Sequence, residues 1–181
     1  FQECQTTKHQ FTKPTSWGDP SLMTDVQIMD DEGNLLPSGQ VGEIVYRGPQ
    51  AMTEYFAQPA LTEESFAHGW FHSGDLGYVD DDHTVFFVDR KKDMIKTGGE
   101  NVASVEVAIT ILALDGIADC AIVGLPHERW TEAITAFVQR VPGSTVTEED
   151  VRQHCAERLA PFKIPKKVLF VDDFPRTASG K

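Results

Sequence analysis

The sequence predicts an α+β fold, in which a small antiparallel, β-barrel-like subdomain is followed by a small α+β domain. Two observations lead to this prediction. Up to about residue 88, short β-rich runs alternate with turn-forming residues, as is typical of a small antiparallel sheet or barrel. Beyond residue 89, two segments that read as helices alternate with three β-rich runs, which indicates an α+β layer.

In the first region, turn chemistry separates the expected strands. The strands are predicted at 26–29, 42–47, 76–79 and 84–88, and the turns at 31–34 and 80–83. Residues 1–15 give no pattern that we can assign.

In the second region we predict helices at 104–114 and 147–159, and strands at 120–125, 134–141 and 168–171. The second helix has clear start signals, because Thr147 can cap it, Asp150 stands at the third helical position and Val146 can pack on Val151. The first segment also alternates like a strand, and its additional apolar residues favour a buried helix.

The charged run Arg90-Lys91-Lys92-Asp93 lies between the two regions, as expected of an exposed linker or hinge. The chain has no initiator Met and stops abruptly after Ser179-Gly180-Lys181, so we expect it to be a fragment.

Composition narrows the functional class. With 181 residues, 40% of them apolar and 24% charged, the chain is typical of soluble globular proteins. A net charge of −12 argues against a nucleic-acid or anionic-membrane surface. No apolar run approaches the roughly 18 residues of a membrane span, and no signal-peptide pattern opens the chain. We expect a cytoplasmic protein, with the mitochondrial matrix as the alternative.

Cysteine and histidine give no sign of a metal site. The three cysteines, Cys4, Cys120 and Cys155, are odd in number and far apart, which favours a reducing compartment over a disulfide framework. The six histidines form no HExxH or Cys/His cluster, so no structural metal is predicted.

Three segments contain candidate site residues. In Gly69–Gly77, glycines surround Asp75, whose carboxylate can accept two hydrogen bonds from a vicinal diol such as a ribose; a capped turn is the alternative. In Val88–Val102, four cations within seven residues precede Gly98-Gly99, a pattern that suits a phosphate-bearing ligand or, alternatively, a solvated charge run and a hairpin turn. Phe174–Lys181 is a polar loop that ends in a lysine but lacks the P-loop pattern.

In this order, the three segments resemble the adenylate-forming (AMP-binding) superfamily of acyl-CoA synthetases, luciferases and non-ribosomal adenylation domains. The similarity runs from about Ser16 to Lys181 and also includes Gly42–Pro49, Pro126–Trp130 and Pro161–Pro165. Lys96 followed by Gly98-Gly99-Glu100-Asn101-Val102 is closer to acyl-CoA ligases than to peptide synthetase domains or luciferases.

The resemblance implies a role for each matching residue. Lys181 is the catalytic lysine that bridges the carboxylate and the α-phosphate. Asp75 holds the ribose hydroxyls, Arg90 contacts the nucleotide, and Lys92 is the hinge. The residues implied for CoA are Gly98 and Gly99 of the pantetheine tunnel, Trp130 near the CoA path, and Lys96.

The resemblance also implies a domain organisation. Residues 1–91 would be the last β subdomain of a large N-terminal AMP-binding domain, with 1–15 unassigned, and residues 92–181 a mobile C-terminal domain that ends at the catalytic lysine. The phosphate loop and the acyl pocket are expected upstream. The Tyr-Gly-x-Thr-Glu segment of the family is absent from residues 1–10, and the chain alone is expected to be inactive.

The reaction implied is ATP-dependent acyl-CoA ligation. A fatty or aryl carboxylic acid attacks ATP to give an acyl-adenylate and pyrophosphate, and the CoA thiol then displaces AMP. ATP with Mg²⁺, bound mainly upstream, and CoA are the expected co-substrates. The alternatives are an adenylation domain that loads a carrier-protein phosphopantetheine, and a noncatalytic module for protein interaction.

Overall fold

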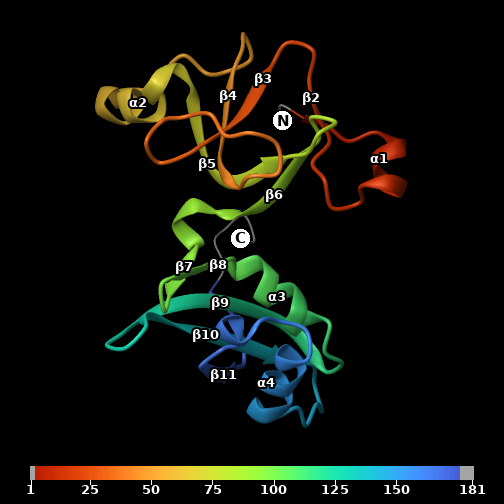
Figure 1. The fold of residues 1–181 in the computed structure, drawn as a ribbon. Coiled ribbons are helices and arrows are strands. Elements are labelled where there is room, and N and C mark those ends of the chain that lie inside the picture. Colours follow the sequence, from red (N-terminus) through yellow and green to blue (C-terminus); the bar gives the residue numbers. More distant parts are fainter. Residues whose placement is uncertain (1–2, 176–181) are drawn as a thin grey trace. The chain divides into compact units, whose positions relative to one another are not determined.

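The computed structural model describes residues 3–175, and the chain divides into two compact units, Phe1–Lys92 (unit 1) and Asp93–Lys181 (unit 2) (Figure 1). The division falls inside the charged run Arg90–Asp93, whose side chains are exposed. Within residues 3–175, no helix is long and apolar enough to cross a membrane.

Unit 1 is built on a four-stranded antiparallel sheet in which the strands follow one another in chain order (Figure 1). The strands are β3 (Asp25–Met29), β4 (Gly42–Arg47), β5 (Phe71–Val79) and β6 (Val85–Arg90). The α+β class is therefore confirmed, but the sheet is open, with β3 and β6 at its two edges, and the expected barrel-like closure is absent. Four short strands give a sheet too narrow to curl into a filled barrel.

Two turns led by an aspartate follow strands of this sheet, one after β3 and one between β5 and β6. Asp30 Oδ1 accepts hydrogen bonds from the backbone N–H groups of Glu32 and Asn34 at 3.0 and 2.7 Å. Asp80 Oδ1 does the same for Asp82 and Thr84 at 3.0 Å each. An aspartate side chain that bonds to the backbone two and four residues on fixes a tight connection, which is why these acidic segments turn rather than extend.

The core of unit 1 lies on both faces of β4. Ile44 packs with Val26, Ile28, Val79 and Val85, whereas its neighbour Val45 packs with Met29 and Trp70. Since successive side chains of a strand point to opposite faces, both faces of β4 are covered.

Unit 1 also contains two short strands and two short helices that the sequence did not indicate. The pair β1 (Glu3–Cys4) and β2 (Asp19–Pro20) is antiparallel, and the helices are α1 (Thr7–Thr12) and α2 (Pro59–Ser65). Lys13, just after α1, connects this segment to the β5–β6 turn. Its Nζ lies 2.5 Å from Asp80 Oδ2 and 2.9 Å from Asp82 Oδ2.

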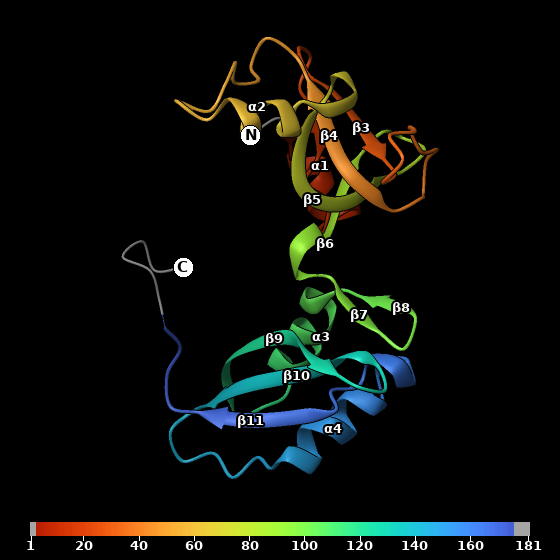
Figure 2. The ribbon, with the colours of Figure 1, turned by 90° about the vertical axis from the view of Figure 1, so that its left-hand side faces the viewer.

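Unit 2 is built on a five-stranded sheet around β10 (Thr131–Arg140) (Figure 2). β9 (Ile117–His127) pairs with β10 in antiparallel fashion, and β11 (Lys167–Val171) pairs with it in parallel. The hairpin of β7 (Ile95–Thr97) and β8 (Glu100–Val102) joins through a bridge between Thr97 and Thr131.

Two helices, α3 (Ser104–Leu112) and α4 (Glu148–Ala156), contribute to one core with this sheet. Val107 and Ile111 of α3, and Val151 and Cys155 of α4, are fully buried at i, i+4 spacing. The side chain of Ile109 is 64% exposed, so the alternating apolar residues of this segment form a helix and not a strand.

Candidate functional site

Asp75, in the middle of β5, and Arg90, the last residue of β6, lie side by side. They are register partners, and Arg90 Nε lies 2.8 Å from Asp75 Oδ1. The ladder has a bulge at Leu76/Gly77. A side chain at Gly77 would collide with the carbonyl oxygen of Phe86, so glycine is required where these strands approach.

The carboxylate of Asp75 is largely buried, and one of its oxygens accepts no hydrogen bond from the described residues. Its side chain is 15% exposed, and that of Arg90 is 56% exposed. Asp75 Oδ1 is buried and, within residues 3–175, receives no hydrogen bond, although Arg90 Nε lies 2.8 Å away as its ion-pair partner. Burial raises the pKa of Asp75, Arg90 opposes part of that rise, and Glu43 adds to it.

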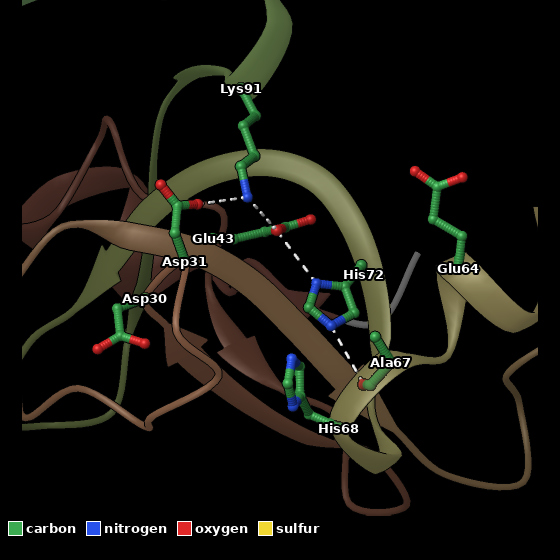
Figure 3. A pocket seen from close by; sticks show the side chains of 8 residues that line it. All are labelled: Asp30, Asp31, Glu43, Glu64, Ala67, His68, His72 and Lys91. Atoms are coloured by element: carbon green, nitrogen blue, oxygen red, sulfur yellow. Dashed lines mark hydrogen bonds and ion pairs between the residues drawn. The ribbon is translucent and has the colours of Figure 1, made fainter.

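Beside this pair, Glu43 is the centre of a network of polar contacts (Figure 3). Its side chain is 7% exposed. Glu43 Oε2 lies 3.0 Å from Lys91 Nζ and 3.1 Å from His72 Nδ1, and Glu43 Oε1 accepts the backbone N–H of Gly74 at 3.0 Å. Lys91 Nζ also lies 2.7 Å from Asp31 Oδ1.

The network borders a cavity of about 330 Å³. Figure 3 shows its lining side chains, which are mostly acidic or imidazole groups: Asp30, Asp31, Glu43, Glu64, Ala67, His68, His72 and Lys91. Burial would raise the pKa of Glu43, but hydrogen bonds from His72 and Lys91 outweigh burial and lower it. Burial would lower the pKa of Lys91, and its contacts with Asp31 and Glu43 raise it instead. Both groups are therefore charged near neutral pH.

In unit 2, Gly98 and Gly99 form the two-residue loop of the β7–β8 hairpin. Their φ angles of 62° and 87° are those of a primed hairpin turn, which glycine adopts without strain. A side chain at Gly99 would meet nothing within 4 Å, so the backbone of this loop is open on that side. The hairpin alternative that the sequence left open is thus the geometry observed.

Trp130 lies against this loop. Its carbonyl oxygen accepts the N–H of Gly98 at 2.9 Å, and its ring edge is 3.9 Å from the point where a Gly98 Cβ would be. The ring stacks on His127 at 4.4 Å between centroids, with the Arg129 guanidinium and Lys166 Nζ 5.6 and 5.5 Å from its centre. Burial, followed by repulsion from Arg152, lowers the pKa of Lys166.

Glu132 fixes the base of the same hairpin. Its Oε2 accepts the backbone N–H of Lys96 at 2.6 Å, and the Lys96 side chain itself is exposed. The preceding residue, Thr131, has a φ of 68°, a left-handed conformation that β-branched residues rarely adopt.

The sequence-predicted residues therefore form two groups. Asp75 and Arg90 touch in unit 1, and Lys92 follows two residues later in the exposed run. The second group is in unit 2 and consists of Gly98, Gly99 and Trp130 around the hairpin, with Lys96 on β7. Lys181 lies outside the described residues.

The sequence reasoning did not assign roles to Glu43, Lys91 or Lys166. Glu43 and Lys91 stood inside quoted motifs, but their contact joins residues 48 positions apart in the chain. Lys166 follows the Pro161–Pro165 motif. The sequence could show only that Glu43 and Lys91 are charged residues inside these motifs. It could not show which residue each of them contacts.

In the described part of the chain, Cys120 and Cys155 make no contact with either group, whereas His127 stacks on Trp130 and His72 contacts Glu43 beside Asp75 and Arg90. Cys120 and Cys155 are free thiols, and burial raises their pKa values to about 12 and about 11. Within residues 3–175, no group of three or more His, Cys, Asp or Glu side chains gathers as metal ligands.

Comparison with known proteins gives matches to one part of the chain and to nearly all of it. Residues 106–181 match the AMP-binding enzyme C-terminal domain. A feruloyl-CoA synthase from Amycolatopsis sp is 42% identical over 173 residues, which are 96% of this chain and 35% of that protein. The chain belongs to the adenylate-forming superfamily.

Two further relatives show the range of this superfamily. A fatty acid–[acyl-carrier-protein] ligase from Streptomyces coeruleorubidus is 42% identical over 155 residues, 86% of this chain and 30% of the relative. The structure of o-succinylbenzoate CoA synthetase from Bacillus subtilis with its acyl-adenylate intermediate has a TM-score of 0.93 and 32% identity, over 99% of this chain and 37% of that one. The chain thus spans about a third of the length of these adenylate-forming relatives.

Proposed function

We propose that this chain is one part of an ATP-dependent acid–thiol ligase that converts a fatty or aryl acid to its CoA thioester. The observation that carries the proposal is the buried Asp75 Oδ1, an acceptor beside Arg90 that no described donor satisfies. A ribose hydroxyl would supply the missing donor, and the half-exposed guanidinium would face the negative charge of a nucleotide.

In the first half-reaction, Lys181 is the proposed catalytic residue for formation of the acyl-adenylate. The substrate carboxylate oxygen attacks the α-phosphorus of ATP, the bond to the β-phosphate oxygen breaks, and pyrophosphate leaves with the bonding electrons. A lysine ammonium between the carboxylate and the α-phosphate opposes the negative charge that builds up during the transfer. ATP brings Mg²⁺, which we assign mainly to a region outside this chain, since the chain spans only about a third of the length of its adenylate-forming relatives.

The second half-reaction uses the hairpin of unit 2. The thiol sulfur attacks the acyl carbon, the bond to the AMP oxygen breaks, and the thiol proton passes to solvent. The open backbone at Gly98 and Gly99 suits the slim pantetheine arm, and Trp130 with its neighbouring cations Arg129 and Lys166 suits an anionic ligand. Lys92 would be the hinge about which 92–181 reorients between the half-reactions. The proposed division at residues 91 and 92 remains a prediction, as does a cytoplasmic or mitochondrial-matrix location.

The test of the first half-reaction is pyrophosphate release by the full-length protein in the presence of ATP and a panel of fatty and aryl acids. Lys181→Ala is expected to lower this release at least ~100-fold, the usual scale for loss of one charge-stabilising group. Lys167→Ala, which removes an exposed lysine elsewhere in unit 2, serves as the matched control. Unchanged release in Lys181→Ala would refute the assignment.

A second arm identifies the acceptor. The wild-type protein is given free CoA or a phosphopantetheinylated carrier protein, and acyl transfer to each is measured. Transfer to CoA supports the proposal, and transfer to the carrier protein alone supports the loading function, which the acyl-carrier-protein ligase relative favours. Absence of pyrophosphate release with every acid would favour the noncatalytic interaction module.

A further inference from the structure

The strand positions of Asp75 and Arg90 need a fixed spacing, because two groups that bind one ligand must stay within hydrogen-bond reach of it. Their own contact does not supply this, since Asp75 Oδ1 receives no hydrogen bond from Arg90 and the Arg90 side chain is 56% exposed. An ion pair whose cationic side chain is largely in solvent holds the spacing of two strands only weakly.

Glu43 contacts the chain on both sides of this pair. Its Oε1 accepts the N–H of Gly74, the residue before Asp75, and its Oε2 contacts the ammonium of Lys91, the residue after Arg90. One carboxylate on β4 therefore connects a β5 residue next to Asp75 with the residue that follows Arg90 at the end of β6. Figure 3 shows Lys91 and His72 converging on this carboxylate.

The position of Glu43 is itself well defined. The side chain is 7% exposed and stands on the central part of the sheet, where β4 pairs with both β3 and β5. A buried carboxylate is stable only when it is neutralised and hydrogen-bonded, and here Lys91 supplies the charge while Gly74 and His72 supply further bonds. Because the buried Glu43 carboxylate needs these contacts, it keeps Lys91, Gly74 and His72 in place.

We propose that Glu43 is a positioning residue for nucleotide binding, which holds Asp75 and Arg90 at a fixed spacing through Gly74 and Lys91. The inference rests on the proposed function, in which Asp75 and Arg90 contact ATP. Lys91 gains a second role from this arrangement. Because Asp31 and Glu43 hold it on unit 1, residue 91 remains with the sheet, and reorientation of the chain can begin only at Lys92.

The kinetic test uses the full-length protein and the isosteric variant Glu43→Gln. The KM for ATP is expected to rise roughly tenfold, the scale on which a displaced binding group acts, with the KM for the carboxylic acid within about twofold of wild type. Asp31→Asn is the matched control, because it removes the exposed partner of Lys91 and leaves the contacts of Glu43 in place. Its KM for ATP is expected to stay within about twofold of wild type.

A second measurement separates positioning from folding. Amide hydrogen exchange of the 181-residue chain, followed by NMR, should show faster exchange at Gly74 in Glu43→Gln than in wild type or Asp31→Asn, with core amides of β4 unchanged. Equal rises in both KM values together with lost core protection would show a structural role only and overturn the inference.

The two proposals fail in different ways. If the wild-type protein releases pyrophosphate and Glu43→Gln binds ATP as well as wild type does, this inference is wrong and the proposed function stands. If the wild-type protein releases none, the proposed function fails, and the nucleotide role of Glu43 fails with it. Unchanged exchange at Gly74 would contradict the role of Glu43 in either case.

Discussion

At the scale of single residues, Thr131 is the clearest conflict between sequence and backbone. It follows the three-residue connection 128–130 between β9 and β10 with a φ of 68°, where glycine is the favoured residue. A left-handed conformation costs an L-residue about 1–2 kcal/mol, and a β-branched side chain adopts it rarely. Nothing in the residue order predicts this strain, because the turn type becomes apparent only with the paired strands.

Thr131→Gly is expected to stabilise the chain by about 0.5–1 kcal/mol, since relief of strain exceeds the entropy that glycine adds to the unfolded state. Urea unfolding followed by circular dichroism measures the change. Thr145→Gly, at an exposed loop position without a positive φ, is the control and should be neutral or destabilising. A loss of stability in Thr131→Gly equal to that of the control would contradict the assignment of strain.

The sequence identified Asp75, Arg90 and the two glycines as site candidates because an acid, a cation cluster and glycines are unusual in those contexts. It could not identify Glu43 as their neighbour. That contact depends on the register of β4 against β5 and on the bulges in the ladder, which local patterns do not encode. Lys181 remains a prediction of the family resemblance.

At the scale of elements, segments with strong end signals were predicted well. α4 begins after Thr147 as expected, with Thr147 and Asp150 forming a reciprocal capping box, and Val146 packs on the core that contains Val151. β4 coincides with its predicted range. α1 and α2 were missed because helices of six and seven residues are too short to show a helical period.

Loss of the Thr147 cap should be measurable. Thr147 Oγ1 accepts the N–H of Asp150 at 3.2 Å, and Thr147→Ala leaves that donor to solvent. We expect a destabilisation of about 1 kcal/mol, with Thr145→Ala, two residues earlier in the same loop, nearly neutral. Comparison of the urea midpoints of the two variants tests this, and equal midpoints would show that the box contributes nothing.

At the scale of the whole molecule, the hydrophobic pattern changes near residue 89, and each unit has buried clusters of its own among the described residues: two in unit 1, on the two faces of β4, and one in unit 2. The order of strands could not be predicted, since the parallel partner of β10 comes from the far end of the chain. The excess of acidic residues, by contrast, can be read directly from the sequence, and it affects how stability depends on pH.

The chain should lose stability on acidification. Hydrogen bonds lower the pKa values of Asp30 and Asp150. Burial would raise the pKa of Asp80, but its contact with Lys13 lowers it. Burial would also raise the pKa of Glu43, but its contacts with His72 and Lys91 lower it. A lowered native pKa gives stability above the ordinary values of 3.8 for aspartate and 4.5 for glutamate, which is lost as the pH falls through the native pKa. Asp75, with its raised pKa, acts in the opposite direction.

Urea titrations between pH 7 and pH 3 measure this loss, and amide exchange locates it. The larger loss is expected in unit 1, which contains Asp30, Glu43 and Asp80. Stability in unit 1 that does not change with pH across this range would contradict the pKa directions above.

The parallel pairing of β11 with β10 also sets an order of folding. β9 and β10 are joined by the short connection 128–130, whereas Thr135 pairs with Lys167 only after the chain between them, including α4, has closed a long loop. Closing a longer loop costs more entropy before any contact is gained. We therefore expect the β9–β10 hairpin to be protected early in refolding and β11 late. Pulse-labelled amide exchange would detect this order, and simultaneous protection of both would refute it.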